Sequence, residues 1–432
     1  MHMKQFRNKL FTILLVISLI IPLPVKASEE DYELKQVVVL SRHNIRAPMS
    51  TKGSALDNAT PHTWYEWSSN ASELSLRGGM LETAMGQYFR KWLESEGLIE
   101  ENWRPEGDEV LFYANAKQRT IATAEYFAGG FLPVGGPEIV TKQEYDKMDP
   151  VFTPQITFVN DAFYKDASEE ILENLPDLEE ECDLLEEVLD FKDSDAYKDG
   201  SIKEFTGKDI EIVLEENKEP GSNGTLKTAV SLADALVLQY YEEADLSKAS
   251  FGHELSEEDW LKICEIKDGY IEAVFGSDLV SKNVAHPLLK EIKKELNNED
   301  RVFIFLCGHD SNLASVLGAL DVEEYRLPEA LETKTPIGCK LVFRHYVKGN
   351  EDYIKTDLVY NSKDQMRNIS ILDEDNPPLI YPLRFEGLKC NEDGMYRYDD
   401  FMKHLDLTID AYDEMLKKYE SSYNVIPKTG VE

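Results

Sequence analysis

Two short stretches of the chain carry side chains suited to holding and attacking a phosphoryl group. The first is the loop Arg42-His43-Asn44-Ile45-Arg46-Ala47-Pro48, which places one histidine between two arginines. A guanidinium group presents a planar fork of donors that matches phosphoryl oxygens, and a neutral imidazole nitrogen can attack phosphorus. Arg42 and Arg46 therefore indicate an anion site, and His43 is the candidate nucleophile within it.

The second stretch is Gly308-His309-Asp310-Ser311-Asn312, which precedes an apolar segment with helical character. We expect Asp310 or Ser311 to be the N-cap of this helix, because both side chains can accept hydrogen bonds from its first amide groups. The start of a helix also offers free amide donors and a positive dipole end to an anion. His309 and Asp310 are therefore candidates for the same anion site.

Three apolar runs are expected to form the strands that position these residues. Val37–Leu40 precedes the first loop and Arg301–Cys307 the second. Glu109–Ala114 precedes residues 115–124, which turn into a helix, so Arg119 lies just beyond a strand end. Strand, helix, strand and helix in this order predict parallel pairing with right-handed crossovers. Loops at the carboxyl ends of such strands form the crevice where ligands bind, so Arg119 is expected to lie beside the two loops.

These motifs resemble those of the histidine acid phosphatases, a branch of the histidine phosphatase superfamily. Residues 42–48 match the Arg-His-x-x-Arg-x-Pro signature, and residues 118–124 match the Gln-Arg-Thr-x-x-Thr-Ala context of a phosphate-clamping arginine. Residues 308–312 are similar to the histidine-aspartate motif. With Asn44 and Ser311, the motifs look most like those of the bacterial glucose-1-phosphatase and phytase subgroup.

The resemblance implies an acid phosphatase that works through a covalent phosphohistidine at His43, with Asp310 as proton donor. The phosphate-binding residues that it implies are Arg42, Arg46, Arg119 and His309. Neither a cofactor nor a metal is expected, because the arginines supply the positive charge. The expected substrate is a small phosphomonoester: glucose 1-phosphate, inositol hexakisphosphate or a related sugar phosphate, or else a broad range of monoesters. Asn44 and Ser311 favour the glucose-1-phosphatase side.

The predicted fold class is α/β, with a mainly parallel sheet flanked by helices and an inserted, mostly α-helical domain. Residues 28–160 and 298–432 are expected to form the discontinuous α/β phosphatase domain, and residues 161–297 the insertion. Long acidic stretches at 168–191, 226–243, 256–275 and 279–296 predict its helices. The related family also carries a helical domain at this point of the chain. Charge runs in these helices indicate solvated faces, and no residue of the insertion can be given a role.

Composition limits the partners and the compartment. The 432 residues include 46 basic and 82 acidic side chains, a formal net charge of −36, which argues against nucleic acid and mildly against a pocket specialised for inositol hexakisphosphate. Residues 1–27 combine a basic start, an apolar core and a small-residue end, which is typical of a signal peptide. Its cleavage would remove four basic residues and leave a formal net charge of about −40. The mature chain is then expected to have no stable membrane span. The protein is therefore expected to be secreted or periplasmic.

Three further interpretations start from the same residues. A mutase of the wider superfamily conflicts with a secretory signal, and a non-catalytic phosphate-binding protein would need neither His43 nor Asp310. A zinc hydrolase built on His43, His62 and His309 has no recognisable metal-site spacing. The aromatic loop Trp64–Trp67 could form a wall against a sugar or simply fill a gap in the packing.

The five cysteines are odd in number and widely spaced, so at least one thiol is expected to be free. Cys307 lies in an apolar run and is expected in the core. Bacterial relatives often carry a tight disulfide near the C-terminus, but no second cysteine follows Cys390 here.

Overall fold

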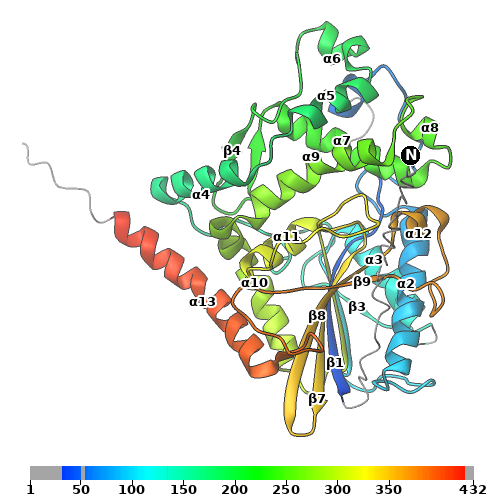
Figure 1. The fold of residues 1–432 in the computed structure, drawn as a ribbon, viewed down its shortest axis with the longest axis vertical. Helices are drawn as coiled ribbons and strands as arrows, with labels where there is room; N and C mark the ends of the chain where they lie inside the picture. Colours follow the sequence, from blue (N-terminus) through cyan, green and yellow to red (C-terminus); the bar gives the residue numbers. More distant parts are fainter. Residues whose placement is uncertain (1–31, 50–53, 134, 424–432) are drawn as a thin grey trace, which may run out of the picture.

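A single twisted sheet forms the centre of the molecule (Figure 1). The computed structural model describes residues 32–49, 54–133 and 135–423, so the predicted signal peptide, 1–27, lies outside the described residues. The strand order is β10-β8-β7-β1-β6-β2-β3, with β9 paired to β8. These strands are β1 (Glu33–Arg42), β2 (Val110–Ala114), β3 (Ile139–Val140), β6 (Phe303–Gly308), β7 (Lys340–Lys348), β8 (Glu351–Tyr360), β9 (Leu379–Pro382) and β10 (Tyr396–Arg397).

The sheet has two halves with different pairing. Strands β1, β6, β2 and β3 run parallel to one another, whereas β7, β8, β9 and β10 pair in antiparallel fashion and join the sheet through β1 and β7. Strands β7 and β8 form a hairpin that turns at Gly349, whose φ of 64° suits glycine. The α/β fold class is confirmed, and its parallel half carries the predicted loops.

Both faces of the sheet are covered, which explains why β1 is apolar without interruption. Val37 and Val39 pack with α2 (Leu76–Ser95) and α3 (Gln118–Phe131), whereas Val38 and Leu40 pack with helices on the opposite face. Successive side chains of a strand point to opposite faces, so a strand covered twice needs apolar residues at every position. The opposite-face helices are α10 (Asp278–Leu296), α11 (Asp310–Ala319) and α13 (Tyr398–Tyr423).

A third apolar cluster joins the remaining helices above the sheet in Figure 1. Its main helices are α4 (Asp161–Asn174), α5 (Glu179–Val188), α7 (Thr225–Glu242) and α9 (Glu257–Gly276). Ile45 and Ile337, from the loops after β1 and before β7, are buried in the same cluster, so these helices pack directly on the site loops.

The single helical stretch expected at 168–191 is wrong. The chain forms α4 and α5 there, separated at Leu175, which is extended with a ψ of 122°. Pro176 follows, and the residue before a proline is pushed away from helical geometry. Between α5 and α7 lie the short helix α6 (Asp195–Lys198) and a hairpin of β4 (Glu211–Val213) and β5 (Gly221–Asn223), and α8 (Leu246–Ala249) follows α7.

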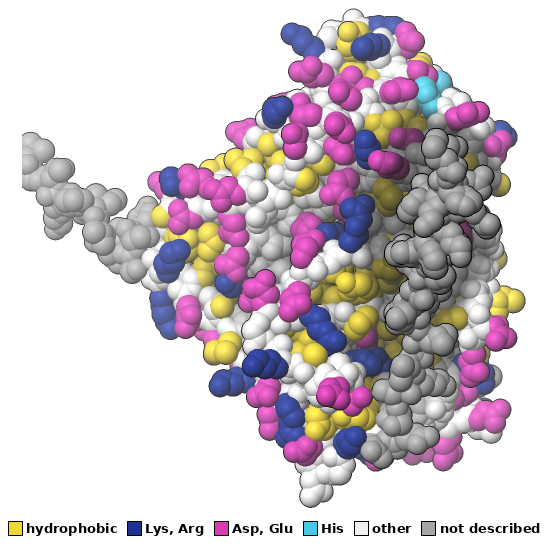
Figure 2. Space-filling view, viewed as in Figure 1, with side chains coloured by type: hydrophobic (Ala, Val, Ile, Leu, Met, Phe, Trp, Pro, Cys, Tyr) yellow, Lys and Arg dark blue, Asp and Glu magenta, His cyan; other side chains and the backbone are white. Residues whose placement is uncertain are grey.

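All five cysteines are free thiols, including Cys390. Cys307 is fully buried in the sheet, as expected from its apolar run. Over the face seen in Figure 2, acidic side chains alternate with lysine and arginine, which keeps the acidic surface solvated. A search of the described residues finds no helix that is both long and apolar enough to cross a membrane.

Candidate active site

Three strand ends meet at one edge of the parallel half and deliver the predicted residues. Arg42 is the last residue of β1 and lies opposite Gly308 of β6, while Ala114 of β2 lies opposite Cys307. The chain continues this alignment beyond the strands, because the His43 amide donates to the Gly308 carbonyl at 3.0 Å. The loops that follow β1, β6 and β2 are therefore held side by side, as the strand order requires.

His43 is oriented by a single hydrogen bond. Its Nδ1 lies 2.9 Å from the Asn44 carbonyl oxygen, which can only accept, so the proton sits on Nδ1 and Nε2 carries the free lone pair. Burial lowers the pKa of His43 well below its usual value, and the positive charges of Arg119, Arg46 and Arg42 add to this effect. A neutral imidazole with a bare Nε2 is the form that can act as a nucleophile.

Asn44 fixes this loop from behind. Its side-chain amide donates to Glu82 Oε1 at 2.8 Å, and the Ile45 amide donates to Asn44 Oδ1 at 2.8 Å. Glu82 in turn pairs with Lys340 at 2.9 Å, with both side chains fully buried. Asn44 therefore holds the shape of the loop, in the interior of the protein.

His309 and Arg119 present two donors to the same space. The ring of His309 lies 5.5 Å from the His43 ring, and its Nε2 accepts from the Asn115 side-chain amide at 2.8 Å. The orientation of this amide is set because Asn115 Oδ1 accepts from the Asp149 backbone. A neutral His309 consequently carries its proton on Nδ1, 3.3 Å from Arg119 Nη2. An anion between these atoms would accept from both.

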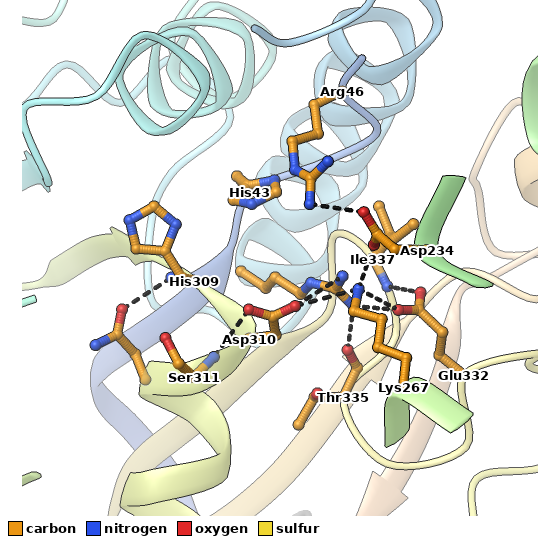
Figure 3. Close-up of polar contacts among 12 residues, drawn as sticks. His43, Arg46, Asp234, Lys267, His309, Asp310, Ser311, Glu332, Thr335 and Ile337 are labelled. Atoms are coloured by element: carbon orange, nitrogen blue, oxygen red, sulfur yellow. Dashed lines mark hydrogen bonds and ion pairs between the residues drawn. The ribbon is translucent and has the colours of Figure 1, made fainter. Parts of the chain in front are cut away.

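Arg42 and Arg46 are held by carboxylates. Arg42 Nη1 contacts Glu332 at 2.8 Å, and its Nη2 contacts Asp310 Oδ2 at 3.2 Å (Figure 3). Arg46 Nη2 contacts Asp234 Oδ2 at 3.0 Å. In contrast, no ion pair within 4.0 Å is found for Arg119 among the described residues, and burial together with Arg46 lowers its pKa to about 10.

The Nε atoms of all three arginines are buried without a hydrogen-bond partner. These are Arg42, Arg46 and Arg119. Guanidinium groups brought together from two segments supply the donors and the positive charge that attract a phosphoryl anion.

The N-cap prediction for α11 is wrong by one or two residues. Asp310 is the first residue of the helix and His309 is its N-cap, with the His309 amide donating to Asn312 Oδ1.

Asp310 Oδ1 accepts from the Ser311 amide at 3.0 Å, while Oδ2 contacts Arg42 and Lys267, both at 3.2 Å. Burial alone would raise the pKa of Asp310, but Arg42 and Lys267 outweigh it and hold the pKa well below its usual value. These two cations therefore favour the ionised form of the carboxyl.

The structure thus brings together all six predicted site residues, but it adds others that sequence reasoning missed. Lys267 of α9, Asp234 of α7 and Glu332 join the charged network in Figure 3. Asp234 interrupts the apolar run Leu232–Leu238 of a buried helix, which was the one signal available in the sequence. A lone charge in such a run requires a buried partner.

Glu219, after β4, is a further missed residue. It is exposed, yet Arg119 and Asp310 are close enough to influence its ionisation. Loss of solvation and the charge of Asp310 raise the pKa of Glu219, while Arg119 opposes the shift.

His62 and the aromatic loop belong to another part of the molecule. His62 Nε2 contacts Asp190 at 2.7 Å, and its ring stacks on Phe251 at 4.9 Å. Trp64 Nε1 donates to the Leu56 carbonyl and its ring packs edge-on against Phe251. His62 is therefore not grouped with His43 and His309, as a zinc site on the three histidines would require. Within the described ranges, no cluster of three or more His, Cys, Asp or Glu side chains is arranged to hold a metal ion.

Comparison with known proteins agrees with this geometry. The family "Histidine phosphatase superfamily (branch 2)" matches residues 33–359. The chain is 36% identical over 411 residues to a glucose-1-phosphatase of Providencia rettgeri, covering 92% of this chain and 98% of the relative. It is 37% identical over 384 residues to a glucose-1-phosphatase of Salmonella typhimurium, covering 87% and 92%.

Solved structures show the same fold. The phytase from Citrobacter braakii superposes with a TM-score of 0.78 at 26% identity, covering 87% of this chain and 98% of that one. The match to the family extends over most of the chain and includes all three motifs that suggested it. The chain therefore belongs to branch 2 of the histidine phosphatase superfamily and is a histidine acid phosphatase, a phosphoric monoester hydrolase.

Proposed function

We propose that this enzyme hydrolyses small phosphomonoesters in two steps through a phosphohistidine at His43. In the first step His43 Nε2 bonds to phosphorus while the ester P–O bond breaks, and Asp310 protonates the leaving oxygen. In the second step water attacks phosphorus, the P–N bond breaks, and Asp310 takes the proton from that water. The observation that carries the proposal is the unprotonated Nε2 of His43, fixed by the Nδ1 hydrogen bond to Asn44 and surrounded by cationic donors.

The phosphoryl oxygens would be held by Arg42, Arg46, Arg119 and His309. The unpartnered Nε atoms of the three arginines and the converging Nδ1 of His309 supply donors from four points of the site. Preorganised donors of this kind stabilise the charge that develops on the equatorial oxygens, and need not reorient during the reaction. Arg42 and Arg46 are already fixed by carboxylates, so Arg119 contributes the cation whose charge is least neutralised.

Asp310 has to gain a proton before it can donate one. Its pKa is held low by Arg42 and Lys267 in the unliganded site. A bound phosphoryl group brings negative charge beside these cations and would raise the pKa of Asp310. This requirement favours acid pH, at which His43 stays neutral because its own pKa is lowered.

Sugar monophosphates are the proposed substrates, with glucose 1-phosphate ahead of inositol hexakisphosphate. Relatives named glucose-1-phosphatase align with 87–92% of the chain at 36–37% identity. Glu219 supports the same order, because a carboxylate near Arg119 opposes a ligand that carries further phosphates. The formal net charge of −36 likewise disfavours the more highly charged hexakisphosphate.

We also propose that the enzyme is exported, because residues 1–27 have the three parts of a signal peptide. The proposed division into an α/β domain (28–160 and 298–432) and a helical insertion (161–297) is supported by the separate apolar cluster of α4, α5, α7 and α9. The second half of α10 packs with the sheet instead, so contact across the second boundary is extensive.

The test is turnover of p-nitrophenyl phosphate in EDTA from acid to neutral pH, with wild type, His43→Ala and Asp310→Asn. We expect chelator-resistant turnover in wild type and its loss in His43→Ala. Glucose 1-phosphate and inositol hexakisphosphate, compared by kcat/KM, test the substrate order. Full activity of His43→Ala would overturn the mechanism, and a higher kcat/KM for the hexakisphosphate would overturn the substrate order alone.

A further inference from the structure

Lys267 lies at the centre of a buried network of six charges. Its Nζ contacts Asp234 Oδ1 at 2.7 Å and both Asp310 Oδ2 and Glu332 Oε1 at 3.2 Å (Figure 3). Arg42 and Arg46 complete the network, which therefore contains three cations and three carboxylates. Lys267 is the member that contacts all three carboxylates.

The carboxylates keep Lys267 charged. Burial and Arg42 would lower its pKa, but Asp234, Glu332 and Asp310 outweigh them and raise it. The ammonium group is thus a permanent positive charge placed against the proposed proton donor.

Lys267 is less accessible to solvent than Asp310. The Asp310 side chain is 19% exposed, whereas that of Lys267 is 7% exposed. Lys267 is therefore placed to act on the reaction through its contact with Asp310.

Both oxygens of Asp310 are restrained. Oδ1 accepts from the Ser311 amide, and Oδ2 is shared between Arg42 and Lys267. Arg42 reaches Oδ2 from the end of β1, and Lys267 reaches it from α9. The carboxyl plane is therefore fixed by contacts from three elements.

We propose that Lys267 is a positioning residue that holds the Asp310 carboxyl in the orientation needed to protonate the leaving oxygen. This inference rests on the role proposed above for Asp310. It assigns a function to a residue of α9, in the helical segment for which the sequence suggested none. It also makes the packing of α9 on the site loops a requirement for proton transfer.

Other charged groups face Asp310 from every element packed around it. The loop after β1 carries His43 and Arg46, α7 carries Asp234, and α3 carries Arg119. The remaining groups are His309 after β6, Glu332 and Cys339 before β7, and Glu219 in the β4–β5 hairpin. None of these eight residues forms an ion pair within 4.0 Å with Asp310; among the described residues, Arg42 and Lys267 do. Lys267 is thus one of two side chains that hold the Asp310 carboxyl directly.

The leaving group separates positioning from a purely structural role. A p-nitrophenolate leaves readily without a proton, whereas an alkoxide leaves only when protonated, so loss of a correctly placed acid slows alkyl esters selectively. We therefore compare kcat/KM, which reports the steps up to departure of the leaving group and not the shared hydrolysis of the phosphoenzyme, for p-nitrophenyl phosphate and glycerol 2-phosphate. The enzymes are wild type, Lys267→Met, Lys267→Arg and Asp310→Asn. Lys262→Met is the matched control, because Lys262 lies on the same helix and pairs with Glu180 in solvent.

For Lys267→Met we expect kcat/KM on glycerol 2-phosphate to fall about 30-fold and kcat/KM on p-nitrophenyl phosphate to fall less than about 3-fold. Lys267→Arg should restore most of the alkyl-ester kcat/KM, and Lys262→Met should match wild type with both substrates. If Lys267→Met does not fold, Lys267→Met/Asp234→Asn removes one charge of each sign and provides the same comparison.

The outcomes distinguish the two proposals. Asp310→Asn must itself be selective for the alkyl ester; equal loss with both substrates overturns the role of Asp310. If Asp310→Asn loses activity selectively on the alkyl ester, but the Lys267 variants that fold lose equal activity on both substrates or none, only the role of Lys267 is overturned.

Discussion

The strand-end loops and the helices α7 and α9 contribute different layers to one site. Loops after β1, β2 and β6 supply the groups that would touch the phosphoryl: His43, Arg119 and His309. Helices α7 and α9 supply Asp234 and Lys267, which form ion pairs with Arg46 and Asp310. In the proposed mechanism the strand ends thus deliver the reacting groups, and the two helices orient those groups.

The largest effect should come from the strand-end layer. His43→Ala removes the nucleophile, and we expect kcat on p-nitrophenyl phosphate to fall by at least about 10⁴-fold with folding unchanged. His62→Ala is the matched control, because that histidine pairs with Asp190 outside the site. Steady-state kinetics with circular dichroism checks both. Activity above a few per cent in His43→Ala would contradict the assignment of the nucleophile.

Arg119→Met should have the second-largest effect on activity. Among the described residues its guanidinium is the site cation without a carboxylate within 4.0 Å, so its loss removes a charge that no direct ion pair neutralises. We expect kcat/KM to fall about 10²- to 10³-fold, with weaker inhibition by inorganic phosphate. Arg90→Met, which breaks a pair with Glu94 on α2, should leave kcat/KM unchanged. Similar losses in the two variants would mean that Arg119 only stabilises the fold.

The helical layer should affect stability as well as rate. Arg46 and Lys267 outweigh the effect of burial and lower the pKa of Asp234 to about 2 from 3.8. A depressed carboxyl pKa stabilises the fold fully above the unfolded pKa, and this stabilisation is lost as pH falls through the folded pKa. Asp234→Asn should therefore cost about 2 kcal/mol of unfolding free energy near neutral pH.

Urea unfolding at several pH values measures this cost. The difference between wild type and Asp234→Asn should shrink as pH falls from about 4 to about 2. Asp161→Asn, an exposed position at the start of α4, should show no such pH-dependent difference. A constant gap for Asp234→Asn would show that lost packing, and not charge pairing, explains its effect.

The smallest expected change is in substrate preference. Glu219→Gln removes an exposed negative charge close to Arg119, so kcat/KM for inositol hexakisphosphate should rise about 3- to 10-fold relative to glucose 1-phosphate. Added salt should reduce this difference, because exposed charges are screened. Glu216→Gln, exposed in the same hairpin, is the control. An unchanged ratio would remove Glu219 from the account of specificity.

The two layers also differ in how far the sequence predicted them. Residues that follow an apolar strand have a location fixed by sheet geometry, so Arg42, His43, Arg119, His309 and Asp310 could be assigned to one crevice. Family resemblance added the role expected of each residue. The sequence located the helices of 161–297 approximately, although Pro176 divides one stretch in two.

Lys267 and Asp234 could not be assigned, because a helix position has no fixed partner until the tertiary packing is known. Asp234 stands alone in an apolar run, which indicates a buried partner without naming it. Its partners are 188 residues earlier and 33 residues later in the chain. Interactions at such separations depend on how α7 and α9 dock on the sheet, which local periodicity does not encode.

The central claim is a covalent bond between phosphorus and His43. Wild type and His43→Ala are mixed with p-nitrophenyl phosphate labelled in its phosphoryl group and quenched rapidly without acid. Peptide mass spectrometry under alkaline conditions then detects the P–N bond directly. We expect a phosphoryl group on the peptide that contains His43, at up to one per chain, and none in His43→Ala. Turnover in wild type without a labelled His43 peptide, or with the label on another residue, would contradict this claim.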